Sequence, residues 1–270
     1  MPLTEFQRRV SRLLGDRRIA AGTSYVAGGA ALNEIIHAPR VSRDLDIFHD
    51  TEQAVASGWD ADRHALEDQG FSVKVLRERP SYVEAEVSRD RQVLRMEWAR
   101  DSAFRFFPLV RHDDLGLMLH PFDLATNKVL ALVGRLEVRD WVDVIYCDER
   151  IQPLGYLAWA ASGKDPGFSP AAILEQAART SRYSAVEIGA LAFEGDAPDA
   201  ANLSQRWRRL LDSARAVIAV LPPDHVGECV LTETGELFMG TSDTAFAAAG
   251  LGKLRYHAGR LHGALPRIVA

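Results

Sequence analysis

The amino-acid sequence predicts a small mixed α/β sheet domain followed by a mainly helical C-terminal domain. Three observations predict this fold class. A Gly-Gly pair joins a short apolar run to a helical pattern, three strand-like runs follow between residues 71 and 98, and the pattern becomes helical after residue 119. Strands and helices do not alternate regularly, as a doubly wound sheet would require. We therefore place an α/β domain at residues 1–115 and a helical domain at residues 116–270.

The elements of the first domain follow from apolar spacing and from turn residues. Pro39 bars further helix and places Ala38 in extended geometry, and Gly70 ends the third helix. A turn over 88–91 joins the last two strands into a hairpin. The expected elements are helices over 3–19, 30–36 and 51–69 and strands over 24–27, 45–48, 71–76, 82–87 and 93–98.

The second domain is predicted as a series of helices. Pro121 opens "PFDLATNKVLALVGR", and "EVRDWVDVIYCDE" continues the helical pattern. Prolines also open the next two helices, where proline suits the first turn. We expect helices over 153–162, 170–180 and 202–220, then a small hairpin in "GECVLTETGELFMG" and a helix in "SDTAFAAAG".

The composition is that of a globular protein, with 47% apolar and 26% charged residues. A net charge of −5 argues against a broadly cationic surface that coats nucleic acid, although it leaves a local basic groove open. Cys147 and Cys229 lack metal-ligand spacing, so we expect two buried free thiols. No run approaches about 18 uninterrupted apolar residues, and the N-terminal segment is a charged amphipathic helix, not a signal peptide. We expect no membrane span and a cytoplasmic location.

Two aspartates on one strand are the first candidate site residues. In "RDLDIF", Asp44 and Asp46 project to the same face, while Leu45 and Ile47 face the core. Two like charges this close repel, and Mg²⁺ is the simplest stabiliser because it prefers carboxylate and phosphate oxygens. Glu97, near the end of the last hairpin strand, is the candidate third carboxylate for two-metal chemistry. The alternatives are a solvated strand edge and a plain exposed glutamate.

The Gly28-Gly29 turn is the second candidate element. A glycine pair between a strand and a helix lets the backbone approach an anion closely, and the free N–H groups and helix dipole favour phosphate. The alternative is a tight turn and nothing more. Combined with the aspartates on the neighbouring strand, the pair predicts one site for a triphosphate and a metal ion. Arg40, Ser42 and Arg43 lie between the two elements and could contact triphosphate oxygens.

The pattern "GGAAL…PRVSRDLDIF" followed by "KVLALVGRLEVRDWVDVIY" resembles the AbiEii/AbiGii-type toxin family, within the polymerase-β-like nucleotidyltransferase superfamily. The resemblance covers residues 25–148, and the two motifs in this order are more specific than either element alone. It implies a polymerase-β-like nucleotidyltransferase domain that moves a nucleotide from an NTP to an acceptor with Mg²⁺. It also implies a tRNA 3′ end as a frequent acceptor and a toxin that an antitoxin protein neutralises.

The resemblance also implies roles by motif position, shared between the triphosphate, the metal and the helical side of the cleft. The implied residues are Gly28 and Gly29 for the triphosphate, Asp44 and Asp46 for metal, Lys128 for the nucleotide phosphates, and Arg139, Asp140 and Asp143 for the cleft wall. From the residues alone, Asp140 and Asp143 share a helix face, and Arg139 can pair with Asp143 at i, i+4. The alternative is a salt-bridged surface helix with Trp141 in the core.

Two departures from the family pattern keep another class of function open. Ala30 stands where relatives often have Thr or Ser, and Glu97 where Asp is more usual, which motivates a nucleotide-binding or interaction module without turnover. A third hypothesis is transfer to a small molecule such as an aminoglycoside, which the acidic net charge favours. For an RNA acceptor, "SQRWRRLLDSAR" supplies arginines around Trp207, which could stack on a base or lie buried in the core.

Overall fold

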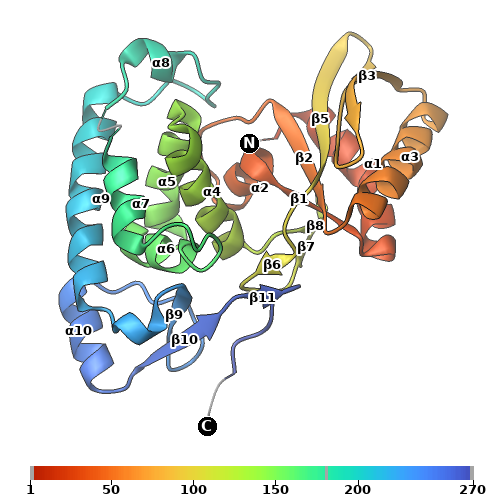
Figure 1. Ribbon diagram of the computed structural model, residues 1–270. Helices are drawn as coiled ribbons and strands as arrows, with labels where there is room; N and C mark the ends of the chain where they lie inside the picture. The colour runs from red at the N-terminus through yellow and green to blue at the C-terminus, as the bar shows by residue number, and fades with distance from the viewer. Residues whose placement is uncertain (1–2, 180–181, 268–270) are drawn as a thin grey trace. The chain divides into compact units, whose positions relative to one another are not determined.

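The computed structural model shown in Figure 1 describes residues 3–179 and 182–267. The chain forms two units, one of Met1–Ala103 and Leu109–His120 and the other of Phe104–Pro108 and Pro121–Ala270. This division differs from the predicted ranges 1–115 and 116–270 at two places. Residues 116–118 form a strand of the first unit's sheet, and residues 104–108 belong to the second unit.

The first unit is built on a mixed seven-stranded sheet, as the predicted fold class requires. Its strands are β1 (Ser24–Ala27), β2 (Asp44–His49), β3 (Ser72–Arg79), β4 (Tyr82–Arg89), β5 (Gln92–Arg100), β7 (Val110–His112) and β8 (Gly116–Met118). They are arranged in the order β3-β4-β5-β2-β1-β8-β7. β2 pairs with β5 and β1 with β8 in parallel, and the other neighbours are antiparallel.

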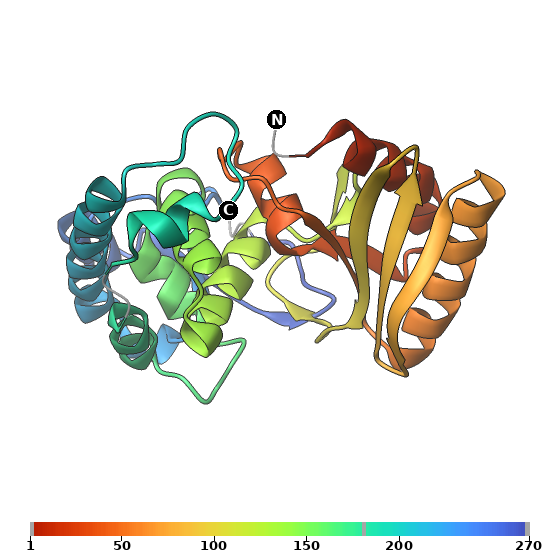
Figure 2. The same ribbon diagram turned by 90° about the horizontal axis from the view of Figure 1, so that it is seen from above.

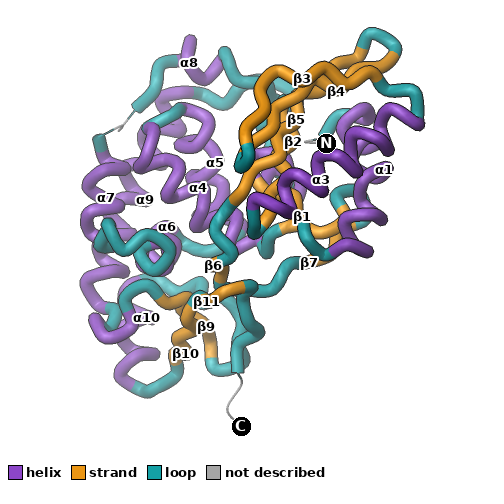
Figure 3. Tube along the Cα trace, turned by 45° about the vertical axis from the view of Figure 1, so that its right-hand side comes forward, coloured by secondary structure: helices purple, strands orange, loops and turns teal. Residues whose placement is uncertain are grey.

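Three helices complete the first unit: α1 (Glu5–Ala21), α2 (Gly28–Ile35) and α3 (Glu52–Asp68). Thr4 begins α1 with a capping box that it shares with Gln7. α1 and α3 lie side by side against one face of the sheet, as Figure 2 and Figure 3 show. β2 turns Leu45, Ile47 and His49 toward this covered face, and all three are fully buried. The opposite face of β2 carries Asp44, Asp46 and Phe48, which are partly exposed.

A polar cluster lies beneath the sheet, between α1, α3 and the strands. The Trp98 indole N–H donates to Asp62 Oδ2 at 2.9 Å, and the Arg18 guanidinium donates to the Leu115 carbonyl oxygen at 2.7 Å. Burial, helped by the positive charge of Arg18, lowers the pKa of His49 from 6.5 to about 4. Burial raises the pKa of Asp62, although the Arg18 charge opposes this. His49 is therefore a neutral core residue at pH 7.

The second unit is mainly helical, as predicted. Its helices are α4 (Pro121–Arg135), α5 (Val138–Arg150), α6 (Leu154–Ala161), α7 (Pro170–Ala178), α8 (Ala185–Gly189), α9 (Ala200–Val220), α10 (Ser242–Gly250) and the 3₁₀ turn η1 (Pro223–His225). The helix predicted over 170–180 ends at Ala178, and residue 180 lies outside the described residues. Cys147 and Cys229 are buried free thiols, as expected.

Two short antiparallel pairs accompany these helices, β9 (Glu228–Thr232) with β10 (Leu254–Ala258) and β6 (Phe104–Arg105) with β11 (Arg260–Leu261). The small hairpin predicted in "GECVLTETGELFMG" is confirmed. Leu231 bridges Leu237 in antiparallel fashion, and the Phe238 backbone N–H donates to the Val230 carbonyl oxygen at 3.1 Å. The other edge of β9 pairs with β10, a pairing that was not predicted. Across the described part of the chain, no helix is both long and apolar enough to cross a membrane.

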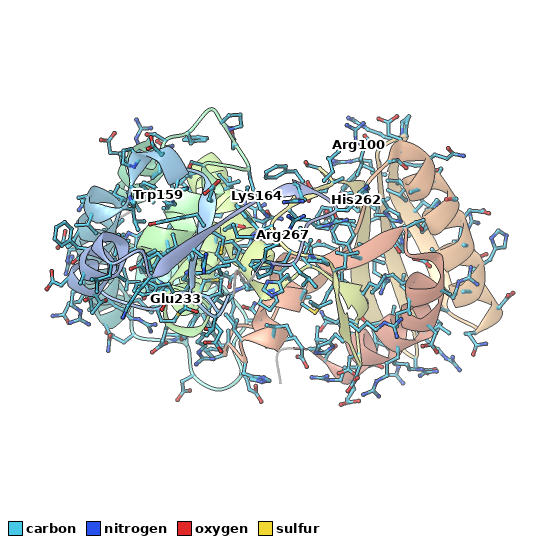
Figure 4. The ribbon with its side chains drawn as sticks, turned by 90° about the horizontal axis from the view of Figure 1, so that it is seen from below. Arg100, Trp159, Lys164, Glu233, His262 and Arg267 are labelled. Carbon is cyan, nitrogen blue, oxygen red and sulfur yellow. The ribbon has the colours of Figure 1, made fainter. Side chains whose placement is uncertain are left out.

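A buried carboxylate fixes residues 104–108 within the second unit. Asp123 on α4 is fully buried and accepts hydrogen bonds from the backbone N–H groups of Phe106 at 2.9 Å and Phe107 at 3.0 Å. Lys164, labelled in Figure 4, places its ammonium 2.7 Å from Asp123 Oδ1. Both oxygens of this carboxylate thus have a hydrogen-bond or ion-pair partner, which is what a buried charge requires.

Asp123→Ala is expected to lower the free energy of unfolding by about 3 kcal/mol, because Lys164 would lose its carboxylate and two buried N–H groups their acceptors. Urea unfolding followed by circular dichroism measures the change. Asp212→Ala is the control, since that side chain is 78% exposed and pairs with Arg215, one helical turn away, at 3.1 Å. The control should change stability by less than about 0.5 kcal/mol. Equal effects of the two substitutions would contradict the anchoring role of Asp123.

His49 makes the stability of the chain depend on pH. Its folded-state pKa of about 4 lies below the 6.5 of the unfolded chain, so the unfolded chain binds the proton more tightly. The stabilisation is complete above pH 6.5 and is lost as pH falls toward 4, by on the order of 3 kcal/mol. In urea unfolding at several pH values, His49→Gln should lack this loss. His64→Gln, at a side chain that is 66% exposed, should keep it.

Candidate active site

β2 brings Asp44 and Asp46 to one face of the sheet. Burial alternates strictly along the strand, with both aspartates partly exposed and Leu45 and Ile47 fully buried on the other face. This alternation is the one expected from the sequence, since successive side chains of a strand point to opposite faces. The carboxylates therefore stand together on the side of β2 that faces away from the α1–α3 layer.

Strand register aligns further carboxylates with Asp46. Glu97 on β5 is the direct neighbour of Asp46 in the parallel β2–β5 pair, and Glu84 on β4 is the direct neighbour of Glu97 in the antiparallel β4–β5 pair. Three acidic side chains thus form one row across three adjacent strands, which lie about 4.8 Å apart. Arg95 occupies the next row, opposite Asp44. Glu84 and its place in this row were missed in the sequence prediction.

The register of β4 against β5 was not predicted because the type of turn between these strands was not recognised. β4 and β5 are joined by Asp90 and Arg91 alone, both with positive φ, 52° and 65°. These are the backbone angles of a two-residue type I′ hairpin turn, which determines every pair along the hairpin. An Asp-Arg sequence is not the usual Asn-Gly signature of that turn, so the prediction named only a turn over 88–91. A two-residue loop at 90–91 would have placed Glu84 opposite Glu97.

The glycine pair lies directly against the carboxylates and the basic loop. Gly28 has φ +70°, which favours glycine, and a Cβ at this residue would overlap the Asp46 carboxylate. A Cβ on Gly29 would lie 2.6 Å from Arg40 Nη2 and 3.1 Å from Ser42 Oγ. A side chain at Gly28 would therefore be strained and would displace the Asp46 carboxylate, and a side chain at Gly29 would displace the end of Arg40. Gly28 and Gly29, predicted to bind the triphosphate, therefore lie next to Asp46, Arg40 and Ser42.

The N-cap residue of α2 provides no side-chain acceptor for the first helical turn. This residue is Ala27, which has no side-chain oxygen to accept a hydrogen bond from that turn. The first turn also contains no acidic residue. Both features suit an anionic ligand at the helix N-terminus, where the helix dipole is positive.

Arg40 and Ser42 belong to a buried loop segment, and Arg43 does not. Arg40 is 5% exposed and Ser42 is 8% exposed, whereas Arg43 points to solvent. The Gln7 side-chain amide donates to the Ser42 carbonyl oxygen at 2.8 Å, and Ser42 Oγ donates to the Asp44 carbonyl oxygen at 3.4 Å. α1 thereby fixes the segment that leads into β2. Arg40 and Ser42 remain candidate phosphate contacts, and nothing supports Arg43 as one.

The donor set on this face suits a hard divalent cation in its chemistry. Asp44, Asp46 and Glu97 offer carboxylate oxygens from one face of two neighbouring strands. As the side chains stand, no group of three or more His, Cys, Asp or Glu residues within 3–179 and 182–267 is gathered closely enough to hold a metal ion. Like charges repel, so a cation would have to draw the carboxylates together. Their metal role stays a prediction.

Lys128 and Asp140, predicted to touch the site, lie in the second unit within a buried ion-pair network. Lys128 Nζ is 3.0 Å from Asp140 Oδ1 and 3.2 Å from Asp143 Oδ2. Arg135 binds Asp140 through two hydrogen bonds, of 2.5 and 2.9 Å. Burial alone would raise the pKa of Asp140, but the hydrogen bonds and charges of Arg135 and Lys128 lower it below its ordinary value. Both aspartates are fully buried, so they hold Lys128 in one position.

One ion pair expected on these helices was wrong, and the structure selects one of the two alternatives for Trp207. Arg139 does not pair with Asp143 at i, i+4; its Nε lies 2.6 Å from Glu137 Oε2, because Asp143 faces Lys128. Trp207 on α9 is fully buried and packs edge-on against Trp141 at 6.0 Å, so it cannot stack on a base. Arginines beside it remain on the surface, and Arg206 pairs with Glu149 at 2.8 Å.

A scan of protein-family models and a search of curated proteins each find no match to this chain. Solved structures are similar to it. A proposed nucleotidyltransferase from H. pylori has a TM-score of 0.54 at 14% identity, over 80% of this chain and 98% of its own. JHP933 from Helicobacter pylori has the same TM-score and identity, over 80% and 95%. MenT4, a nucleotidyltransferase toxin from Mycobacterium tuberculosis H37Rv, has a TM-score of 0.51 at 16% identity, over 81% and 85%.

The chain therefore has a nucleotidyltransferase fold, which confirms the fold class predicted from the sequence. The resemblance to toxin nucleotidyltransferases is consistent with these neighbours, one of which is such a toxin. At 14% to 16% identity the likeness establishes the fold alone. The role of each site residue rests on the geometry described above.

Gly28→Ala is expected to destabilise the chain by about 1–2 kcal/mol, because it combines positive φ with a Cβ that overlaps the Asp46 carboxylate. Gly134→Ala is the matched control. No atom lies within 4 Å of a Cβ at that position of α4, so alanine should be neutral or stabilise by up to about 1 kcal/mol. Urea unfolding compares the two. In an Asp46→Ala background the overlap disappears, and a Gly28→Ala cost that stays undiminished would contradict the contact.

Proposed function

We propose that the chain transfers a nucleotide from an NTP to an acceptor hydroxyl, with Mg²⁺ as cofactor and pyrophosphate as the second product. The observation that carries this proposal is the contact of the Gly28-Gly29 turn with Asp46, beside Arg40 and Ser42. The helix N-terminus suits phosphate, and the neighbouring carboxylates suit a divalent cation. A polyphosphate with a bound metal ion is the ligand that would use both.

Each residue then has a defined part in the proposal. The backbone N–H groups of Gly28 and Gly29 bind the triphosphate, and Arg40 and Ser42 neutralise and orient its oxygens. Asp44, Asp46 and Glu97 would hold Mg²⁺, which when bound supplies positive charge for the phosphates and the attacking oxygen. In the second unit, Asp140 and Asp143 hold the Lys128 ammonium in place, and Lys128 is proposed to contact the nucleotide phosphates.

The reaction is an in-line displacement at the α-phosphorus. The acceptor oxygen forms a bond to the α-phosphorus, the bond to the bridging oxygen of the β-phosphate breaks, and the electron pair leaves with pyrophosphate. The acceptor proton passes to a carboxylate or to water, and Glu97, which lies between Asp46 and Glu84 in the row, is proposed to help remove it. Catalysis by these residues is mostly positioning and electrostatic stabilisation.

For the acceptor we propose an RNA, such as a tRNA 3′ end, and for the biological role a toxin neutralised by an antitoxin protein. The likeness to MenT4, itself a nucleotidyltransferase toxin, supports this choice over a small-molecule acceptor such as an aminoglycoside. NTPs, Mg²⁺ and tRNA occur together in the cytoplasm, which is the compartment that this reaction requires.

One observation favours a second candidate, a nucleotide-binding module without turnover. Ala30 is fully buried at the position where a hydroxyl would otherwise contact phosphate, so the turn offers backbone groups alone. Such a cradle can bind an NTP without assisting its transfer. Calorimetry that finds NTP binding in a chain that forms no transfer product would favour this candidate.

Asp46→Asn is expected to reduce nucleotide transfer by about a thousandfold or more, because the residue lies nearest the phosphate cradle. The assay incubates the chain with each labelled NTP, Mg²⁺ and total tRNA, then separates labelled RNA on a gel. Asp60→Asn removes the same charge at a side chain that is 74% exposed on α3, and should leave transfer unchanged. Transfer that survives Asp46→Asn, or failure of every NTP with RNA, protein and aminoglycoside acceptors, would sink the proposal.

A further inference from the structure

The open face of the sheet carries one more buried charge than the proposed reaction uses. Glu84 on β4 is 5% exposed and lies directly opposite Glu97, a second negative charge. Like charges directly opposite on neighbouring strands destabilise a sheet, and a buried carboxylate costs free energy unless it is paired. An apolar side chain would suit the fold better at this position. The charge of Glu84 therefore calls for a role beyond folding.

Two neighbours bind Glu84. The Arg95 guanidinium forms a close ion pair with Glu84 Oε1, and the Tyr82 hydroxyl donates to Glu84 Oε2 at 3.3 Å. Arg95 also forms a longer ion pair with the third carboxylate, with its Nε 3.9 Å from Glu97 Oε1. Arg95 can thus reach both glutamates, and it is bound to Glu84. Its side chain is 50% exposed, so it has room to move.

Tyr82 joins the same two carboxylates. Burial and the charges of Glu97 and Glu84 raise the pKa of Tyr82 well above its ordinary value, so its hydroxyl keeps the proton and remains a donor. The hydroxyl can therefore hold Glu84 in the position in which it binds Arg95. This contact orders Glu84 without adding a positive charge to the row.

We propose that Glu84 is a positioning residue of the candidate site: by forming the closer ion pair with Arg95, it keeps that guanidinium from moving fully onto Glu97, with which Arg95 makes only a long contact, and leaves the Glu97 carboxylate available to a divalent cation beside Asp46. The inference rests on the proposed function, in which Glu97 is a metal ligand. Without the Glu84 charge, the nearest carboxylate to Arg95 is Glu97. A guanidinium and a metal ion would then compete for the same oxygens.

The test measures binding of Mn²⁺ alone to the full chain by electron paramagnetic resonance. Glu84→Gln keeps the size of the side chain and removes its charge, and it should weaken Mn²⁺ binding about fivefold, the effect of one partly exposed ion pair. Arg95→Gln removes the competing cation at a half-exposed position and should tighten Mn²⁺ binding. The double variant should bind at least as well as the wild-type chain.

Glu86→Gln is the matched control for the loss of one negative charge. Glu86 lies on the same strand and the same face as Glu84, is 41% exposed and has Lys74 as its ion-pair partner at 3.8 Å. It should weaken Mn²⁺ binding much less than Glu84→Gln does. In a Glu97→Gln background, Glu84→Gln should have no larger effect than Glu86→Gln, because Arg95 then has no ligand to block.

The outcomes separate this inference from the proposed function. A wild-type chain that binds no Mn²⁺ overturns the metal assignment, and with it both proposals. Mn²⁺ binding by the wild-type chain, with equal effects of Glu84→Gln and Glu86→Gln, overturns the role of Glu84 alone. The same holds if Arg95→Gln weakens binding, or if the effect of Glu84→Gln persists undiminished when Glu97 is replaced.

Discussion

The contact between the Gly28 backbone and the Asp46 carboxylate is the constraint on which the candidate site depends. β1 and β2 are antiparallel, with Ala27 directly opposite Asp46, so β1 ends where the carboxylate stands. The chain must turn at the next residue, and only a residue without Cβ leaves space for the carboxylate. The distance between phosphate cradle and carboxylates is therefore set by strand register, which is rigid, and not by flexible side chains.

The two faces of β2 differ in the charge that they carry. The side chains on the covered face are neutral at pH 7, and the open face presents two carboxylates that a cation could reach. On the covered face His49 is fully buried and neutral at pH 7, because burial disfavours its charged form. On the open face Asp44 and Asp46 remain partly exposed, so water can solvate their charges when no cation is bound. A six-residue strand thus anchors the sheet to α1 and α3 while presenting two carboxylates. The alternation of a strand makes both possible.

The sequence predicted what depends on local pattern and failed where long-range pairing decides. Alternation along β2 and β5 showed which side chains share a face, and the glycine pair marked the strand–helix turn. The partners of Lys128 and Arg139 were not predictable in this way, because helix spacing offers several pairs and tertiary packing selects among them. For Trp207 the sequence left a base-stacking and a buried indole both possible, and the apolar stripe of α9 turns the indole into the core.

The acidic row that contains Glu84 depends on one strand pairing that is predictable from local sequence and on one that is not. Its position opposite Glu97 follows from a two-residue turn at Asp90 and Arg91, so the information lies within a single hairpin. The row reaches Asp46 only through the parallel pairing of β2 with β5, and β3, β4 and α3 intervene in the sequence between these strands. Parallel neighbours need such a long crossover, and no local pattern specifies their register. An acidic row across three strands therefore becomes visible only when both pairings are known, although each carboxylate in it can be found from the sequence alone.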